Sequence, residues 1–200
     1  MTGTSASTGP RAQGKSATSA ETAAAKSVRD TILLLMGVSG SGKTTIALEL
    51  RRLLGWQFAD GDDLQLSANV EKMRAGHPLS DEDRRPWLER VARWIDEHLA
   101  AGTPGIVTCS NLKRSYRRMT IGSRKGVMLV HLRGPEPLIA MRIAERRHWF
   151  MPTSLLRSQF ETLEEPMEDE HPIVVSVEGS VAGTVIDLLG KVAAEQARGR

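Results

Sequence analysis

A glycine-rich loop at residues 37–44 carries the side chains of this sequence that are best suited to chemistry. It reads Gly-Val-Ser-Gly-Ser-Gly-Lys-Thr and fits the pattern G-x-x-x-x-G-K-[ST]. Its glycines let backbone N–H groups approach phosphate oxygens, Lys43 can reach the β- and γ-phosphates, and the Thr44 hydroxyl can hold Mg²⁺. The motif therefore predicts a protein that binds a nucleoside triphosphate. The expected nucleotide contacts are Gly37, Ser39, Gly40, Ser41, Gly42, Lys43, Thr44 and Thr45.

Two acids, Asp60 and Asp62, flank a glycine directly after a short apolar segment at residues 56–59. In open α/β sheets, ligands bind beyond the carboxyl ends of the strands, which is where this turn is expected. One acid can hold Mg²⁺ through water, and the other can accept a proton from a hydroxyl nucleophile. The alternative is an Asx turn that caps the next helix. Because the turn follows a phosphate loop, we favour the chemical role.

The elements that position these residues alternate between strands and helices. Apolar segments predict strands, and apolar residues at helical spacing predict a helix after each strand. This alternation is typical of an α/β fold with a parallel sheet covered by helices on both faces, the layout of a small P-loop kinase. The predicted strands are 32–36, 56–59, 105–110, 127–132 and 173–177, and the main predicted helices are 45–54, 67–75, 81–99, 111–118, 135–147 and 181–192.

Residues 147–165 break the periodicity between the fourth and fifth strands and follow several arginines. An excursion at this place is a candidate lid that closes over phosphates. Arg142, Arg146 and Arg147 would then stabilise charge on the transferring group. The alternative is a packed surface hairpin with solvated arginines.

Composition limits the classes of protein to consider. Residues 1–28 are rich in Ala, Ser, Thr and Gly and are expected to form a disordered leader before a single domain at 29–200. The single cysteine, Cys109, excludes an internal disulfide and fits a reducing, cytoplasmic compartment. We expect it to be a small buried side chain, and His131 to be structural. No apolar run is long enough to span a membrane, and a net charge of +3 gives little reason to expect nucleic acid.

Longer motifs add a resemblance to this reading. The phosphate loop, the Asp-Gly-Asp turn, the segment from Lys72 to Leu88, the segment Cys109-Ser110-x-Leu112-Lys113-Arg114-x-Tyr116-Arg117 and the segment from Phe150 to Pro166 resemble bacterial-type gluconate kinases over about residues 31–190. The resemblance implies a nucleoside-monophosphate-kinase-like fold and ATP- and Mg²⁺-dependent phosphorylation of D-gluconate to 6-phospho-D-gluconate. It also implies a homodimer, and a product that feeds the pentose phosphate or Entner–Doudoroff route.

The sequence departs from the family pattern at several positions. Gln65 and Trp149 stand where the family usually has His, and Asn111 where it has Ala. Arg118 and Ile121 stand where it tends to have Asp and Arg. We expect several of these positions on the acceptor side of the site.

Roles follow from the motifs and the resemblance together. Lys43, Asp62, Arg142 and Arg146 are the expected catalytic residues, and Thr44 and Asp60 the expected metal ligands. The cations Lys113, Arg114 and Arg117 would meet the carboxylate of the acceptor. The full set of expected acceptor contacts is Asp60, Asp62, Lys113, Arg114, Tyr116, Arg117 and Gln159. Two alternatives stay open: a kinase of the same fold with another acceptor, such as a different sugar acid or a polyol, and a nucleotide-binding regulator without catalysis.

Overall fold

The computed structural model describes residues 31–145 and 153–198. The predicted leader at 1–28, Arg146, and the start of the predicted lid with Arg147 and Trp149 lie outside the described residues. No helix in the described part is long and apolar enough to cross a membrane.

Five parallel strands form one sheet in the order β2–β3–β1–β4–β5. This confirms the predicted five-stranded parallel sheet. The strands are β1 (Ile32–Met36), β2 (Gln57–Ala59), β3 (Gly105–Thr108), β4 (Val127–Arg133) and β5 (Ile173–Ser176). Because β1 lies at the centre, the loop that follows it emerges between the ends of β3 and β4.

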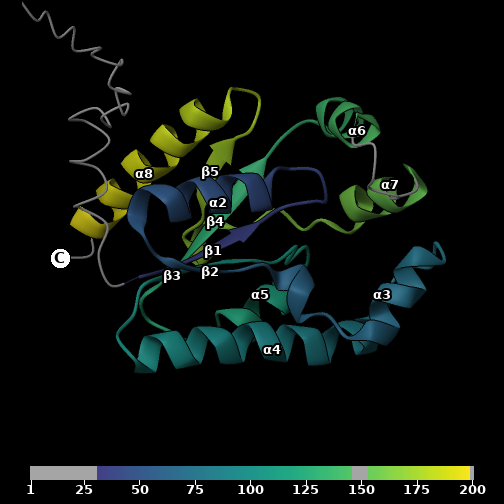
Figure 1. Ribbon diagram of the computed structural model, residues 1–200, viewed down its shortest axis with the longest axis horizontal. Helices are drawn as coiled ribbons and strands as arrows, with labels where there is room; N and C mark the ends of the chain where they lie inside the picture. Colours follow the sequence, from purple (N-terminus) through teal and green to yellow (C-terminus); the bar gives the residue numbers. More distant parts are fainter. Residues whose placement is uncertain (1–30, 146–152, 199–200) are drawn as a thin grey trace, which may run out of the picture.

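Helices cover both faces of the sheet, as Figure 1 shows, with α2 and α8 on one face and α4 and α5 on the other. Three further helices, α3, α6 and α7, gather at one end of the molecule (Figure 1). Their bounds are α2 (Lys43–Leu54), α3 (Ser67–Arg74), α4 (Asp81–Ala100), α5 (Arg114–Thr120), α6 (Glu136–Ala144), α7 (Thr153–Thr162) and α8 (Val181–Arg198), with short 3₁₀ turns η1 (Gly61–Leu64) and η2 (Glu168–Glu170).

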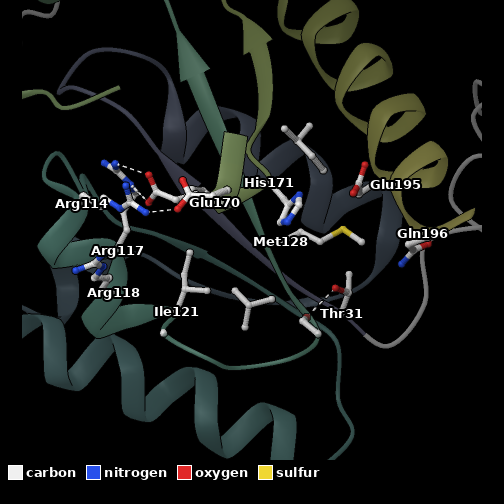
Figure 2. Close-up of a pocket in the computed structure, with 16 residues that line it drawn as sticks. Thr31, Arg114, Arg117, Arg118, Ile121, Met128, Glu170, His171, Glu195 and Gln196 are labelled. Atoms are coloured by element: carbon white, nitrogen blue, oxygen red, sulfur yellow. Dashed lines mark hydrogen bonds and ion pairs between the residues drawn. The ribbon is translucent and has the colours of Figure 1, made fainter. Parts of the chain in front are cut away.

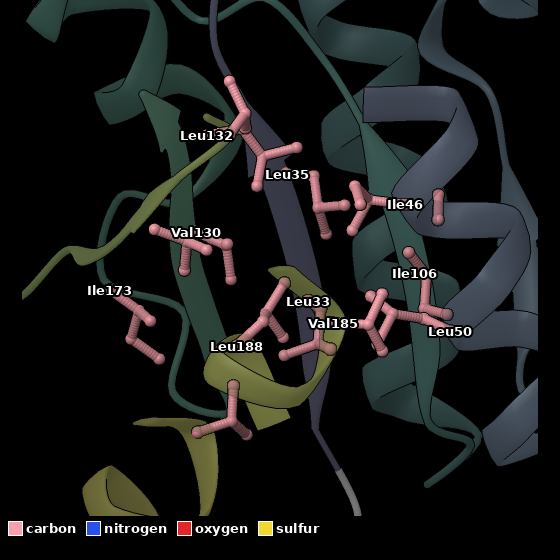
Figure 3. Close-up of a cluster of buried hydrophobic side chains, with 14 of the residues drawn as sticks. Leu33, Leu35, Ile46, Leu50, Ile106, Val130, Leu132, Ile173, Val185 and Leu188 are labelled. Carbon is pink, nitrogen blue, oxygen red and sulfur yellow. The ribbon is translucent and has the colours of Figure 1, made fainter. Parts of the chain in front are cut away.

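The core has two halves, one on each face of the sheet. Leu33 and Leu35 of β1 pack against α2 and α8, together with Leu188 (Figure 3). Ile32 and Met36 point to the other face and join the side chains of α4. A strand buried on both faces must be apolar at every position. This explains the unbroken apolar run Ile32–Met36 that precedes the phosphate loop.

Helices α5 and α8 differ most from their predicted bounds. The chain after β3 stays irregular until α5 begins at Arg114, rather than turning helical at Asn111, because Asn111 has a φ of +45° and Lys113 is extended. Helix α8 continues to Arg198 beyond the predicted end at 192, since the added residues include three alanines and other strong helix formers. Both differences leave the predicted topology intact.

Candidate active site

The phosphate loop joins the end of β1 to the start of α2, as the motif predicts. Gly40 and Gly42 have φ values of +83° and +93°, in the region that favours glycine. A Cβ at Gly40 would also lie 2.7 Å from Ile143 of α6. The Lys43 ammonium donates to the carbonyl oxygens of Gly37 and Val38 at 3.0 and 3.1 Å. The loop thus holds its lysine over its own first residues, next to the N-terminus of α2.

A hydroxyl and a carboxylate meet beside this loop. Thr44 Oγ1 donates to Asp60 Oδ2 at 2.7 Å, so the two residues predicted to bind Mg²⁺ lie together. Mg²⁺ usually takes one or two protein oxygens along with substrate phosphates and water, and this pair of oxygens fits that requirement. No cluster of three or more His, Cys, Asp or Glu side chains in the described residues could hold a metal ion. Phosphate would therefore have to complete the coordination.

The Asp-Gly-Asp turn is fixed by two neighbouring elements. Thr108 at the end of β3 donates to Asp60 Oδ1 at 2.9 Å and accepts the Gly61 N–H at 3.1 Å. Trp87 of α4 donates to the Gly61 carbonyl at 2.6 Å. A Cβ at Gly61 would lie 2.0 Å from the Thr108 carbonyl oxygen, so only glycine allows this close approach. Sequence reasoning missed Thr108 because a threonine inside a strand carries no motif.

Asp62 has the electrostatic surroundings of a proton acceptor. Its carboxyl is accessible to water but crowded by protein atoms, and this desolvation raises its pKa. The Lys43 charge opposes the rise, and the charges of Asp60 and Asp63 add to it. A raised pKa brings a carboxylate closer to neutral pH, which strengthens it as a base. These surroundings favour the predicted role of Asp62 as the base.

The predicted acceptor cations have partners of their own. Lys113 Nζ lies 2.8 and 3.0 Å from the two Asp81 oxygens, and the Tyr116 hydroxyl donates to the same carboxylate at 2.5 Å. Arg114 forms an ion pair with Asp169. Lys113 and Tyr116 therefore form one cluster at the N-terminus of α4, while Arg114 faces η2.

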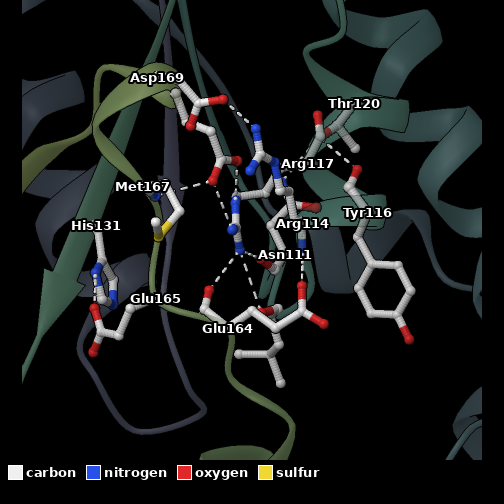
Figure 4. Close-up of polar contacts among 12 residues, drawn as sticks. Asn111, Arg114, Tyr116, Arg117, Thr120, His131, Glu164, Glu165, Met167 and Asp169 are labelled. Atoms are coloured by element: carbon white, nitrogen blue, oxygen red, sulfur yellow. Dashed lines mark hydrogen bonds and ion pairs between the residues drawn. The ribbon is translucent and has the colours of Figure 1, made fainter.

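Arg117 is held in the interior (Figure 4). It is 2% exposed, and its Nε and Nη2 donate to Glu170 at 2.7 and 2.9 Å. Its Nη1 donates to three backbone carbonyls, including that of Glu164 at 2.9 Å. Every guanidinium nitrogen is thus occupied by the protein. This arrangement favours a structural role in fastening residues 164–170, in place of the predicted contact with an acceptor carboxylate.

A cation that sequence reasoning did not assign lies at the same end of the sheet. The Arg84 guanidinium stands 5.7 Å from the centre of the Tyr116 ring. Burial raises the pKa of the Cys109 thiol to about 12, and this thiol also senses the charges of Lys43, Asp62 and Arg84. These three charges therefore lie near the carboxyl end of β3. The signal in the sequence was a cation just after the acidic first turn of α4, where the helix dipole disfavours positive charge.

Arg142 lies on the outer flank of the phosphate loop. Its Nη2 donates to the Val177 carbonyl at 2.6 Å. A cavity of about 340 Å³ opens beside it. The structure therefore gives Arg142 a place next to the loop glycines and the start of α8, and this place is suited to the base of a nucleotide. The lining includes Gly40, Gly42, Thr45, Arg142, Gly179 and Val181.

Gln159 of α7 contacts the loop directly. Its Oε1 accepts the Ser39 N–H at 2.7 Å, and its Nε2 donates to Ser39 Oγ at 3.1 Å. The sequence-based prediction placed Gln159 with the acceptor, and in the structure it contacts Ser39 of the phosphate loop.

The positions that depart from the family pattern separate in space. Arg118 and Ile121 line a cavity of about 690 Å³ that also borders Thr31 and Met128, the residues at the starts of β1 and β4 (Figure 2). This is the opposite end of the sheet from the phosphate loop. Gln65 accepts a hydrogen bond from Asn69 at 3.2 Å. The expectation that several departures lie on the acceptor side therefore does not hold for Arg118 and Ile121.

Fold and site together define a P-loop kinase: a parallel sheet, a phosphate loop after its central strand, and acids at the neighbouring strand end. A family model described as an AAA domain matches residues 32–168. A gluconokinase from Gluconobacter oxydans is 49% identical over 73% of this chain and 82% of its own length, and a thermosensitive gluconokinase from Escherichia coli is 47% identical over 70% and 75%. The chain belongs to the gluconokinase family. The crystal structure of a gluconokinase from Sinorhizobium meliloti is 38% identical, with a TM-score of 0.75 over 84% of this chain and 95% of that one.

Proposed function

We propose that this enzyme transfers the γ-phosphate of ATP to the terminal hydroxyl of D-gluconate, giving 6-phospho-D-gluconate and ADP. The observation that carries the proposal is the meeting of Lys43, the Thr44–Asp60 pair and Asp62 at one end of the sheet, in a chain of the gluconokinase family. The relatives' names support gluconate as the acceptor. Arg118 and Ile121, which depart from the family pattern, give no ground for another acceptor, since they lie at the far end of the sheet.

The nucleotide is proposed to lie along the loop. Its base enters the cavity beside Arg142, and its phosphates meet the loop N–H groups and Lys43. Thr44 and Asp60 would hold Mg²⁺, which supplies positive charge to the phosphates when bound. Thr108 keeps the Asp60 carboxylate turned toward Thr44. These contacts neutralise and orient the group that is transferred.

The acceptor is proposed to lie between Asp62 and the α4–α5 cluster. Asp62 takes the proton of the terminal hydroxyl, whose oxygen bonds to the γ-phosphorus as the bond to the ADP oxygen breaks. Arg84 and Lys113 provide positive charge for the acceptor carboxylate, with the Tyr116 ring beneath both cations. We assign the carboxylate to Arg84 and Lys113 because Arg117 is buried with every guanidinium nitrogen bound to protein, whereas Lys113, although paired with Asp81, is accessible to solvent.

Further parts of the proposal concern the whole protein. We propose a domain at 29–200 that acts as a homodimer in the cytoplasm, with a disordered leader at 1–28 and a lid at about 147–165 that brings Arg146 to the phosphates. The product would enter the pentose phosphate or Entner–Doudoroff route. Size-exclusion chromatography with light scattering tests the dimer.

The first experiment is ADP release with Mg-ATP against D-gluconate, related sugar acids, polyols and shikimate. Turnover on gluconate well above the other acceptors is the expected result. Arg84→Gln should raise the KM for gluconate by about tenfold or more, because a charge-assisted contact is lost, and should leave the KM for ATP unchanged. Arg85→Gln is the matched control, since Arg85 is exposed on the same helix. Preference for another acid would overturn the assignment of gluconate, and ATP binding without turnover on any acceptor would favour a non-catalytic role.

A further inference from the structure

Gln159 connects α7, the helix of the proposed lid that the structure describes, to the phosphate loop. Its Oε1 accepts the Ser39 N–H at 2.7 Å, and its Nε2 donates to the Ser39 hydroxyl at 3.1 Å. Both ends of one carboxamide are therefore used by one loop residue, although the two residues are 120 positions apart. The carboxamide serves once as acceptor and once as donor, whereas an apolar side chain of similar size can make neither contact.

The N–H that Gln159 occupies lies where the terminal phosphate is expected. The Lys43 ammonium rests 3.0 and 3.1 Å from the carbonyl oxygens of Gly37 and Val38, the two residues just before Ser39. In this motif the lysine reaches the β- and γ-phosphates. A phosphate oxygen is also a stronger acceptor for an N–H than a neutral amide oxygen. ATP therefore has both the position and the strength to take over the Ser39 N–H.

The far end of α7 is fixed independently of this contact. The Glu164 N–H donates to the Leu112 carbonyl at 2.8 Å, and the buried Arg117 donates to the Glu164 carbonyl at 2.9 Å (Figure 4). Helix α7 is thus held just after its C-terminus, by the packing of Leu155 and Leu156 in the core, and by an exchangeable contact at Gln159. Loss of the Gln159 contact leaves the other two in place.

We propose that Gln159 is a positioning residue that couples occupancy of the phosphate loop to α7. In the ligand-free enzyme its carboxamide holds the Ser39 N–H, and the γ-phosphate of ATP takes this N–H and releases α7 to shift on its Glu164 attachment. ADP lacks the γ-phosphate and leaves the contact in place. This coupling rests on the proposed function only in requiring that the loop binds ATP.

Nucleotide affinity tests the exchange. Calorimetry with Mg-ATP and Mg-ADP compares the wild type with Gln159→Leu, which keeps the size of the side chain but removes both hydrogen bonds. Because ATP no longer competes with one hydrogen bond, we expect its Kd to fall about fivefold, with the Kd for ADP unchanged. Gln159→Glu should weaken ATP binding, since its charge faces the phosphates. Glu161→Gln, an exposed change on the same helix, is the control.

Unchanged or weaker ATP binding by Gln159→Leu, or an equal gain for ADP, would overturn the proposal. Hydrogen exchange of the peptide 153–162 provides the second measurement. ATP should speed exchange in the wild type while ADP does not, and Gln159→Leu should exchange quickly without nucleotide. Slower or unaltered exchange with ATP in the wild type would contradict the release of α7.

Neither measurement involves the acceptor, so the two proposals fail separately. These ATP responses without gluconate turnover would support the role of Gln159 and contradict the proposed acceptor. Normal gluconate turnover, together with an ATP affinity that Gln159→Leu does not improve, would support gluconate as the acceptor and contradict the role of Gln159.

Discussion

The Thr108 hydroxyl donates to Asp60 Oδ1 at 2.9 Å, across 48 positions of sequence. The other oxygen of the same carboxylate accepts from Thr44 at 2.7 Å. Thr108 at the end of β3 thus orients Asp60, which follows β2, toward the hydroxyl of Thr44, which follows β1. The proposed metal site is a product of three neighbouring parallel strands, and its geometry depends on a residue that would not itself touch the metal.

Replacing Thr108 by Val should therefore impair the use of Mg²⁺. The change keeps the shape of the side chain but frees Asp60 to rotate and leaves the buried Gly61 N–H without its acceptor. We expect the half-saturating Mg²⁺ concentration to rise severalfold and the free energy of unfolding to fall by about 1–3 kcal/mol. Mg²⁺ titrations of initial rate and urea unfolding measure the two effects. Thr103→Val, at an exposed threonine before β3, should change neither.

The pH profile should report the raised pKa of Asp62. A base must be deprotonated to act, so kcat/KM should fall as the pH drops through the pKa of Asp62, at a value above the ordinary aspartate pKa of 3.8. Asp62→Asn should lower kcat by about a hundredfold or more and remove this acidic limb. Asp63→Asn should keep the activity and move the limb to lower pH, since the Asp63 charge raises the pKa of Asp62. An acidic limb that survives in Asp62→Asn would assign the base to another group.

Breaking the buried ion pair between Arg117 and Glu170 should destabilise the fold. Removing one partner of such a pair leaves a buried charge, so Glu170→Gln should lower the free energy of unfolding by about 3 kcal/mol at pH 7. Glu161→Gln, which breaks an exposed pair with Arg157, should cost less than about 0.5 kcal/mol. Denaturant unfolding compares the two variants. Equal losses in both would mean that burial adds nothing to the Arg117 pair.

The Arg117–Glu170 pair should also make the free energy of unfolding depend on pH in the acidic range. Its hydrogen bond from Arg117 lowers the pKa of Glu170 below the ordinary 4.5. A lowered pKa means that the contribution is complete above 4.5 and is lost as the pH falls through the lower, folded-state value. The stability difference between wild type and Glu170→Gln should therefore shrink below pH 4.5. A constant difference down to pH 3 would contradict this coupling.

Cys109 should be inert in the native enzyme. It is 1% exposed, and burial raises its pKa to about 12, so almost no thiolate forms at pH 8. A thiol reagent should react with it only on unfolding. Since it is the single cysteine, the labelling rate gives the rate of opening of this part of the core. Labelling of the folded protein at the rate of a free thiol would contradict the burial of Cys109.

Much of this protein can be predicted from local sequence. The apolar run of β1, the glycines of the loop and the lysine that ends it lie within one short segment, so their spacing alone predicts the strand, the loop and the helix in register. The alternation of strands and helices then predicts a parallel sheet, and the Asp-Gly-Asp turn falls at its carboxyl edge as expected. The sequence patterns that predict these features are each local in the chain, although the sheet itself pairs strands that are far apart.

Only the tertiary structure decided which distant side chains meet. Thr108 orients Asp60 because β3 lies between β2 and β1 in the sheet, and no periodicity states that order. Arg117 carries the same charge as Arg84 in the sequence, yet the fold buries the first against Glu170 and sets the second beside Tyr116. Likewise, Gln159 meets Ser39 because α7 returns to the loop. Charge and residue type are local properties, whereas burial and partners arise when segments far apart in the chain pack together.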